Sequence, residues 1–257
     1  MSDQITLQAL SGIPMIEPGD DLALVIAEAL DASELVLQAG DILVLAQKIV
    51  SKVEGRIVDL RQVTPGARAI ELSAASGKNP RLVELILAES ASIIRQERGL
   101  LITEHRQGWI MANAGIDASN VQSEGGAENV LLLPVDPDGS AADLRQELSQ
   151  RYGVDIGVII SDSFGRPWRL GTTGVALGAA GVPSLWDRRG ARDLFGRELR
   201  ASQQAVADEL ANAASLLQGQ ADEGLPAVLV RGLEFSGMAP ERPAVDLIRD
   251  ASEDLFR

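Results

Sequence analysis

The apolar residues of this chain occur in short runs and on helical faces, separated by Gly, Pro and Asp. The runs predict buried strands at 42–46, 56–60, 100–104, 109–112, 130–134, 156–160 and 227–230. Helical spacing predicts helices at about 20–30, 80–90, 140–152 and 195–217. In the last of these, Leu199, Val206, Leu210, Ala213 and Leu217 share one face, and Gly219 ends the helix. Because no regular strand–helix–strand repeat is present, we expect an α+β (mixed α/β) fold.

Two segments rich in small or polar residues interrupt this pattern of predicted strands and helices. Residues 171–181 are mostly Gly, Ala and Thr, which predicts close approach of the backbone to another element or to a ligand. Residues 123–128 are polar and glycine-rich and predict a surface loop. A boundary between subdomains would fall near 123–126 or 137–140. We nevertheless expect one domain over 1–257, with its core at about 5–235.

Composition limits the possible environments of the chain. The absence of Cys excludes disulfides and thiolate metal sites. No apolar run approaches the roughly 20 residues of a membrane span, and no signal peptide is visible, so we expect a cytoplasmic protein. A net charge of −14 disfavours nucleic acid as a partner, although arginines cluster between Arg166 and Arg197. A small anionic ligand explains such a local cluster better.

The segment Ser161-Asp-Ser-Phe-Gly-Arg-Pro-Trp-Arg169 carries the densest candidate chemistry. It follows a predicted strand, and Gly165 and Pro167 favour a loop. A carboxylate beside a hydroxyl can hold a hard divalent cation, and arginines can bind phosphate or carboxylate oxygens. This combination is expected where a protein handles a metal-bound phosphate ester.

Several common catalytic and nucleotide-binding motifs are absent from the sequence, which reduces the number of possible mechanisms. The chain has neither a P-loop nor a convincing Gly-x-Gly-x-x-Gly sequence. Its single histidine, His105, excludes two-histidine zinc sites and disfavours a hydrolase triad. We expect His105 to have a structural or exposed role at a strand end.

Two further loops contain oxygen-bearing side chains, at 113–120 and 218–224. Their Asn, Asp, Gln and Glu residues are equally typical of turns and helix caps, so each loop alone decides nothing. Together with 161–169 they supply enough oxygen ligands for two divalent ions. Lys52, on a turn-prone stretch after a strand, either reaches a phosphate or is an exposed turn lysine. Trp168 and Trp186 either stack on a flat ring or anchor a core.

Six motifs in fixed order resemble those of the coenzyme F420-0:L-glutamate (γ-glutamyl) ligase family. They are Gly12-Ile-Pro-Met-Ile16, Ile49-Val-Ser-Lys-Val-Glu-Gly-Arg56, Ala112-Asn-Ala-Gly-Ile-Asp-Ala-Ser-Asn-Val121, the segment 161–169, Asp193-Leu-Phe-Gly-Arg-Glu-Leu199 and Gly219-Gln-Ala-Asp-Glu-Gly224. The resemblance implies a family-specific fold of two intimately joined subdomains and an intertwined homodimer. It also implies that the chain lacks the C-terminal flavin-reductase-like domain of actinobacterial relatives.

The activity implied by the resemblance is GTP-dependent addition of L-glutamate to coenzyme F420-0, with γ-linked extension to longer products. GDP and phosphate are released, and the expected cofactors are two Mg²⁺ or Mn²⁺ ions and a K⁺ ion. Chemically, the substrate carboxylate would attack the γ-phosphate of GTP, and the glutamate amine would displace phosphate from the acyl phosphate.

Carried over by motif, Asp117 and Asp162 are the catalytic metal ligands of one ion, and Ser163 and Gln220 bind the second. The residues implied for the GTP site are Ile13, Pro14, Met15, Ile16, Lys52, Asn120, Gln218, Gly219, Gln220, Ala221, Asp222, Glu223, Gly224 and Leu225. Gln47 stands where some relatives have Ser or Thr. For the substrate carboxylates and coenzyme tail, the candidates are Arg166, Arg169 and Arg189, although Arg189 and Arg192 equally suit surface or dimer salt bridges.

Three alternative functions remain open from the sequence. The same two ions would serve a metal-dependent nucleotide phosphohydrolase. A ligase of this family could act on another carboxylate acceptor. A non-catalytic coenzyme-binding protein would bind the same ligands without turnover.

Overall fold

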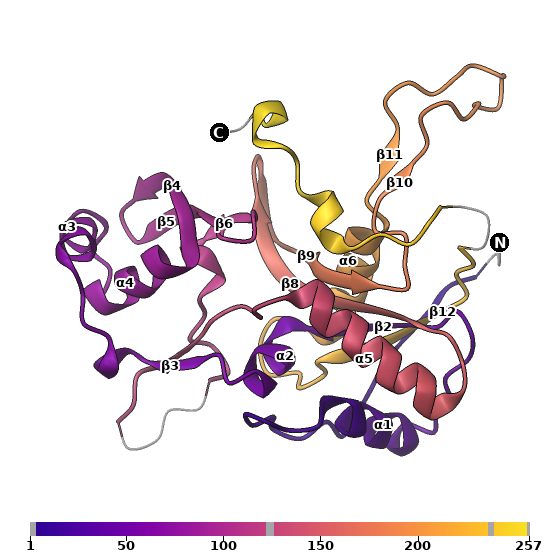
Figure 1. Ribbon diagram of the computed structural model, residues 1–257, viewed down its shortest axis with the longest axis horizontal. Helices are drawn as coiled ribbons and strands as arrows, with labels where there is room; N and C mark the ends of the chain where they lie inside the picture. The colour runs from indigo at the N-terminus through magenta and orange to yellow at the C-terminus, as the bar shows by residue number, and fades with distance from the viewer. Residues whose placement is uncertain (1–3, 122–125, 236–238, 256–257) are drawn as a thin grey trace.

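A five-stranded mixed sheet forms the centre of the larger lobe (Figure 1). The computed structural model describes residues 4–121, 126–235 and 239–255. The strands run in the order β1 (Thr6–Ala9), β12 (Ala227–Arg231), β2 (Ile42–Ala46), β8 (Gly157–Arg166) and β9 (Arg169–Ala180). Only β2 and β8 pair in parallel. Separate helices and a mixed sheet confirm the α+β prediction.

Helices cover both faces of this sheet because its central strands are apolar on both sides. Leu43 and Leu45 of β2 pack with α1 (Leu22–Ala32) and α5 (Pro137–Tyr152), which bury Ile26 and Leu144. The alternate residues, Ile42 and Val44, face α6 (Val206–Gln218). Such two-sided burial explains why these strands are continuous apolar runs in the sequence.

A smaller lobe follows β2 in the chain and has a core of its own (Figure 1). Its helices are α3 (Ala67–Ser76) and α4 (Pro80–Glu89), which pack against the meander of β4 (Ser90–Glu97), β5 (Leu100–His105) and β6 (Ile110–Ala112). The ribbon of β3 (Ile57–Asp59) and β7 (Asn129–Leu131) connects this lobe to the larger one. Residues 123–125, which the predicted loop at 123–128 shares with the possible boundary at 123–126, lie outside the described part of the chain.

The small residues of 171–181 allow two helices to approach β9. A Cβ on Gly174 would lie 2.3 Å from the carbonyl oxygen of Ala211 in α6. A Cβ on Gly178 would lie 2.1 Å from the carbonyl oxygen of Pro137 in α5. Both separations are shorter than van der Waals contact, so only glycine permits this packing. The predicted close backbone approach is confirmed, and its partners are helices.

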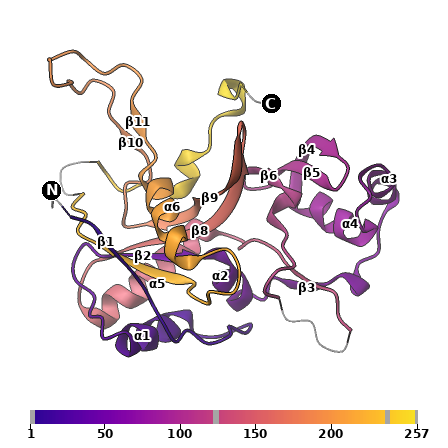
Figure 2. The ribbon, with the colours of Figure 1, turned by 180° about the vertical axis from the view of Figure 1, so that it is seen from behind.

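The prediction that the last helix begins near residue 195 is wrong. α6 begins at Val206, and residues 186–204 form an extended arm that projects from the larger lobe (Figure 2). Its base is the short ribbon of β10 (Trp186–Asp187) and β11 (Gln203–Gln204). Leu199 has helical spacing to the residues of α6 but does not lie in that helix. The arm instead pairs its backbone groups through turns of its own, such as the hydrogen bond from Asp193 N–H to Arg197 O at 2.9 Å.

Two other local predictions also need correction. Residues 161–166 are not a loop, because β8 continues to Arg166 and pairs with β9 as a long hairpin. Only Pro167 and Trp168 form its turn, with Trp168 at φ 64°. Lys52 does not lie in a turn, since α2 spans Gln47–Val53. Cross-strand pairing overrode the local signal of Gly165, whereas Gly55, at φ 67°, does lie in the turn that follows α2.

His105 has the structural role expected of it. It lies at the end of β5, only 2% exposed, and its Nδ1 accepts a hydrogen bond from the Gln107 N–H at 3.1 Å. Its Nε2 lies 3.7 Å from Glu89 Oε2, and Arg56 and Arg106 form ion pairs with the same carboxylate. These three neighbours, His105 foremost, lower the pKa of Glu89 to about 2. Among the described residues, no helix is long and apolar enough to cross a membrane.

Candidate functional site

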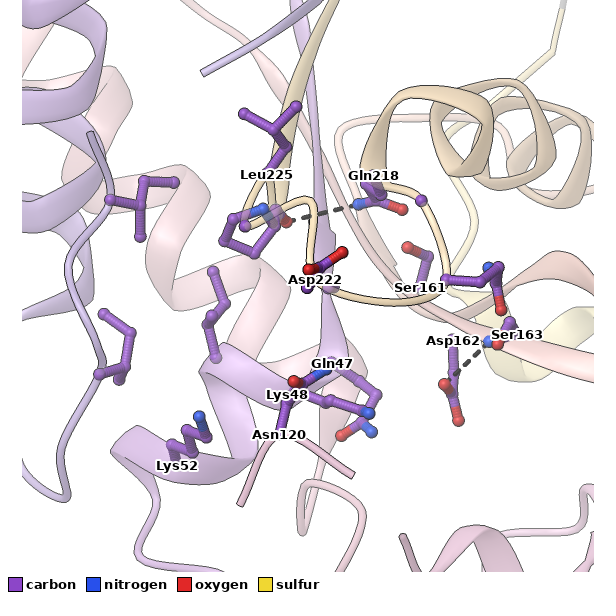
Figure 3. Close-up of a pocket in the computed structure, with 18 of the residues that line it drawn as sticks. Gln47, Lys48, Lys52, Asn120, Ser161, Asp162, Ser163, Gln218, Asp222 and Leu225 are labelled. Atoms are coloured by element: carbon purple, nitrogen blue, oxygen red, sulfur yellow. Dashed lines mark hydrogen bonds between the residues drawn. The ribbon is translucent and has the colours of Figure 1, made fainter. Parts of the chain in front are cut away.

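A cavity of about 370 Å³ lies where α2, the middle of β8 and three loops meet (Figure 3). Segments far apart in the sequence form its wall. The lining residues are Ile13–Ile16, Ala46–Ile49, Lys52, Asn120, Ser161–Ser163, Ser215, Gln218–Asp222 and Gly224–Pro226. The first motif, the lysine motif and the three oxygen-rich segments at 113–120, 161–169 and 218–224 therefore contribute to one site.

The structure brings together most of the residues that the resemblance assigns to GTP. All of them line the cavity except Glu223. Asp162, Ser163 and Gln220 line it as well, whereas Asp117 does not line it and forms an ion pair with the lining residue Lys48. Arg166, Arg169 and Arg189 do not line it: the first two lie exposed at the β8–β9 hairpin tip, and Arg189 pairs with Asp187 on the arm.

Helix α2 places two lysines on the cavity wall. Lys48 and Lys52 are four residues apart, so their side chains leave the helix on the same side. Lys52 is only 8% exposed, and burial, together with the charge of Lys48, lowers its pKa. Within the described part of the chain, no carboxylate forms an ion pair with Lys52. A buried cation that faces a cavity without a counter-ion is suited to an anionic ligand.

Side-chain hydrogen bonds connect the loops around the cavity. Asn120 has φ 56° and donates from Nδ2 to the carbonyl oxygen of Ala221 at 3.1 Å. Thr172 of β9 lies 3.3 Å from Gln220 Oε1. The loops at 113–120 and 218–224 are therefore positioned against each other as well as against the sheet.

Gly219 and Glu223 shape the 218–224 loop. Gly219 has φ 72°, and a Cβ there would lie 2.0 Å from the Glu223 carboxyl carbon. Glu223 accepts a hydrogen bond from the Ala221 N–H at 2.8 Å, and such backbone donors lower its pKa. Glu223 therefore folds the loop onto itself, which explains why its side chain turns away from the cavity.

Asp162 has the most perturbed carboxylate of the site. Its Oδ1 accepts a hydrogen bond from the Ser163 N–H at 2.8 Å (Figure 3). Burial raises the pKa of Asp162 to about 6, and the negative charge of Asp117 adds to this effect. Lys48 opposes the shift. The negative charge of ionised Asp162 is therefore only partly compensated by neighbouring positive charge, and a bound cation would compensate it.

Asp117 is held by neighbours that stabilise its charge. Burial by itself raises its pKa, but hydrogen bonds from Lys48 and Ser119 outweigh burial and lower the pKa below its usual value. Lys48 Nζ lies 2.7 Å from Asp117 Oδ2, and Ser119 Oγ donates to the same oxygen at 2.8 Å. The two carboxylates therefore differ: Asp117 is compensated, and Asp162 is not.

These residues fit a hard divalent cation that a phosphate-bearing substrate also coordinates. The candidate donors Asp117, Asp162, Ser163 and Gln220 are all oxygen donors, which Mg²⁺ and Mn²⁺ prefer. No group of three or more His, Asp or Glu side chains in the described ranges could hold a metal alone. Mg²⁺ typically binds one or two carboxylates together with substrate phosphates, which matches so sparse a donor set.

Comparison with known proteins agrees with the geometry. The model of the family described as "F420-0:Gamma-glutamyl ligase" matches residues 12–232. The chain belongs to this family. A "Coenzyme F420:L-glutamate ligase" from Methanothermobacter thermautotrophicus is 46% identical over 98% of this chain and 99% of its own length. Relatives of the same name from Methanopyrus kandleri and Methanocaldococcus jannaschii are 49% and 43% identical. The first covers 94% of this chain and 93% of its own length, the second 90% and 91%.

The F420-0:Gamma-glutamyl ligase fold also places residues in the cavity that the sequence did not single out. Lys48 and Ser215 line it without having been predicted, and Ser161 lines it although the sequence assigned no role to it individually. Lys48 could have been found from its spacing to Lys52 if α2 had been predicted as a helix. Gln47 lines the cavity too, but it is 2% exposed and accepts a hydrogen bond from Ser51 Oγ at 2.8 Å.

A second cavity of about 250 Å³ lies beyond Phe164, further along β8. It shares no lining residue with the first. Trp109, Phe164, Leu247 and Ile248 form the large apolar part of its wall, and the charged residues Asp208, Arg249 and Asp254 line it as well. Its character therefore suits a flat or apolar group better than a polyphosphate.

Proposed function

We propose that this protein ligates L-glutamate to coenzyme F420-0 with consumption of GTP, in the biosynthesis of coenzyme F420. The reaction forms an amide bond and releases GDP and phosphate. Family membership and the name shared by relatives at 43–49% identity support the acceptor and the amino acid. The charges that line the cavity support the proposal that a nucleotide is the other substrate.

The observation that carries the proposal is the arrangement of charges across the cavity. Lys52, buried and without a carboxylate partner among the described residues, lies across the cavity from Asp162 (Figure 3). A metal-bound polyphosphate supplies negative charge for the lysine and positive charge for the carboxylate at the same time. A neutral ligand would leave both groups uncompensated.

The chemistry that follows is activation of a carboxylate. The carboxylate of the acceptor attacks the γ-phosphate, and the resulting acyl phosphate is attacked by the glutamate amine with loss of phosphate. Lys52 would hold phosphate oxygens, while Asn120 and the 218–225 loop would enclose the nucleotide. Arg166, Arg169 and Arg189 would bind the carboxylates of glutamate or the anionic tail of the coenzyme.

Asp117 and Asp162 would hold one divalent ion, and Ser163 and Gln220 a second. When bound, Mg²⁺ or Mn²⁺ neutralises phosphate oxygens and aligns donor and acceptor. A monovalent K⁺ ion belongs to the proposal only through the family resemblance. The same holds for γ-linked extension to longer products.

The decisive test is mass spectrometry of F420-0 incubated with the protein, L-glutamate, GTP and Mn²⁺. We expect a mass gain of one or more glutamate units that requires all four components, and a smaller gain with ATP. Omission of glutamate should stop both the mass gain and sustained phosphate release. Rapid phosphate release from GTP alone, without any mass gain, would instead indicate a nucleotide phosphohydrolase.

We also propose that the protein is a cytoplasmic homodimer. Support for the dimer comes from apolar side chains at the ends of both extensions. Leu194 and Phe195 on the arm are 100% and 96% exposed, and Leu170 on the hairpin is 99% exposed. Such groups favour burial against a second copy. Light scattering should give twice the mass of one chain, and Phe195→Asp should weaken the dimer.

A further inference from the structure

Lys48 lies beside both carboxylates of the candidate cation site. Its Nζ is 2.7 Å from Asp117 Oδ2 and donates a hydrogen bond to Ser119 Oγ at 2.6 Å. Its charge also stabilises ionised Asp162. An ammonium group is thus already present where a divalent cation would bind.

We propose that Lys48 is an internal counter-ion that competes with the divalent cation for Asp117 and makes cation binding dependent on nucleotide. Without nucleotide, Lys48 occupies Asp117. With nucleotide, the phosphates provide Lys48 with another anionic partner, and Asp117 becomes available. This inference rests on the proposed function, because it assigns Lys48 a positioning role in the same metal–nucleotide site.

Electrostatics makes the competition unavoidable. A divalent ion on Asp117 and an ammonium 2.7 Å from the same carboxylate would be separated by only a few ångströms. Repulsion between them, in a site partly shielded from water, disfavours their simultaneous binding. Lysine is suited to leave because its charge is carried on a flexible four-carbon stem.

The geometry of α2 provides the alternative position for Lys48. Lys52 follows one helical turn later and faces the same cavity. Each ammonium disfavours the charged form of the other, and the charge of Lys48 accordingly contributes to the lowered pKa of Lys52. A phosphate between them relieves this repulsion and releases Asp117 in one step. Because coupling is reciprocal, the cation should also strengthen nucleotide binding.

The test is a measurement of Mn²⁺ affinity by electron paramagnetic resonance, with and without a non-hydrolysable GTP analogue. For the unmodified protein we expect the analogue to tighten Mn²⁺ binding by about 10-fold or more, within the usual range of coupling. Lys48→Met should bind Mn²⁺ alone about 10-fold more tightly than the unmodified protein, and the analogue should tighten its Mn²⁺ binding by a smaller factor than in the unmodified protein.

Two matched variants separate this role from a general change in charge. Lys52→Met removes a positive charge from the same face of α2 but none that contacts Asp117, so its affinity for Mn²⁺ alone should stay within about twofold of the unmodified protein. Lys48→Arg keeps the charge and should keep the coupling. Lys48→Gln, whose side chain is polar and uncharged, replaces the Met variant if that variant fails to fold.

The outcomes distinguish this inference from the proposed function. Unchanged or weaker Mn²⁺ binding by the neutral Lys48 variants, with coupling intact, would overturn the counter-ion role and leave the ligase proposal standing. The counter-ion role also fails, and the ligase proposal stands, if the unmodified protein binds Mn²⁺ equally well with and without the analogue. If the unmodified protein binds neither Mn²⁺ nor the analogue, both proposals fail.

Discussion

The cavity and the two arginine-bearing extensions differ in how the fold uses their charges. In the cavity, Lys52 and Asp162 come from separate elements, Lys52 being buried and Asp162 half-buried. On the arm, five arginines alternate with three acidic residues between 186 and 204. There Arg189 pairs with its near neighbour Asp187, and Arg188 lies 4.1 Å from the ring centre of Trp186.

From this difference we expect uncompensated charge to indicate a binding site more reliably than a cluster of charges in the sequence. Charges that are buried without partners cost stability, so they persist only where function requires them. Exposed arginines beside acidic residues are compensated by their neighbours and by water. The predictions that follow test this difference between the two regions.

Replacing Asp162 with Asn should have the largest effect. The variant keeps the shape but loses the charge that would hold the divalent ion, so we expect turnover to fall by about 1,000-fold or more, as for other residues that act on the reacting groups. Steady-state release of GDP in the complete reaction measures this. Turnover within tenfold of the unmodified protein would remove Asp162 from the proposed machinery.

Lys52→Ala should weaken binding of nucleotide by about 10- to 100-fold, the usual value of a charge-assisted hydrogen bond to phosphate. Isothermal titration with the GTP analogue and Mg²⁺ gives the affinity directly. Lys78 offers a matched control, because burial also lowers its pKa but it lies outside the cavity lining. Equal losses from Lys52→Ala and Lys78→Ala would show a general electrostatic effect.

The same Asp162→Asn change should stabilise the metal-free protein. Because the pKa of Asp162 is raised from 3.8 to about 6, ionisation destabilises the folded state, and the cost is full above pH 6. Two pKa units correspond to about 3 kcal/mol, and partial contact with water reduces this to about 1–2 kcal/mol.

Thermal unfolding in a chelator at several pH values tests this stabilisation. The gain of the variant should be full at pH 7 and should shrink as the pH falls from 6 toward 4, where the unfolded carboxyl is also protonated. A gain that does not change with pH would show that packing, not ionisation, is responsible.

Substitutions in the arm and the β8–β9 hairpin should have the smallest effect on nucleotide affinity. Arg189→Ala removes one surface ion pair, so the affinity for GTP analogue should change by less than about twofold, and stability by less than about 1 kcal/mol. The KM values for F420-0 and glutamate test the substrate role proposed for Arg166, Arg169 and Arg189. A large loss of nucleotide affinity in Arg189→Ala would contradict the distinction between the two regions.

Much of the fold follows from local patterns in the sequence. A helix was predicted at about 20–30, and α1 spans Leu22–Ala32, capped by Asp21, whose side chain accepts a hydrogen bond from the Leu24 N–H at 2.9 Å. The apolar runs at 42–46 and 227–230 were predicted as strands, and both are buried on two faces. Where local signals were equivocal, as at Gly165 and Leu199, pairing with a distant strand or an independent set of turns decided the structure.

The sequence by itself determined the family, the mixed fold and the identity of most residues that line the cavity. Ordered motifs carry that information even when their local structure is predicted wrongly. Only the tertiary structure decided which groups meet. It placed Lys48 against Asp117, which lies 69 positions away in the chain. It also left Lys52 and Asp162 without full compensation and kept the arginines of the arm outside the cavity. The reason is physical: burial and the compensation of charge depend on neighbours in space, and these are set by the packing of distant elements.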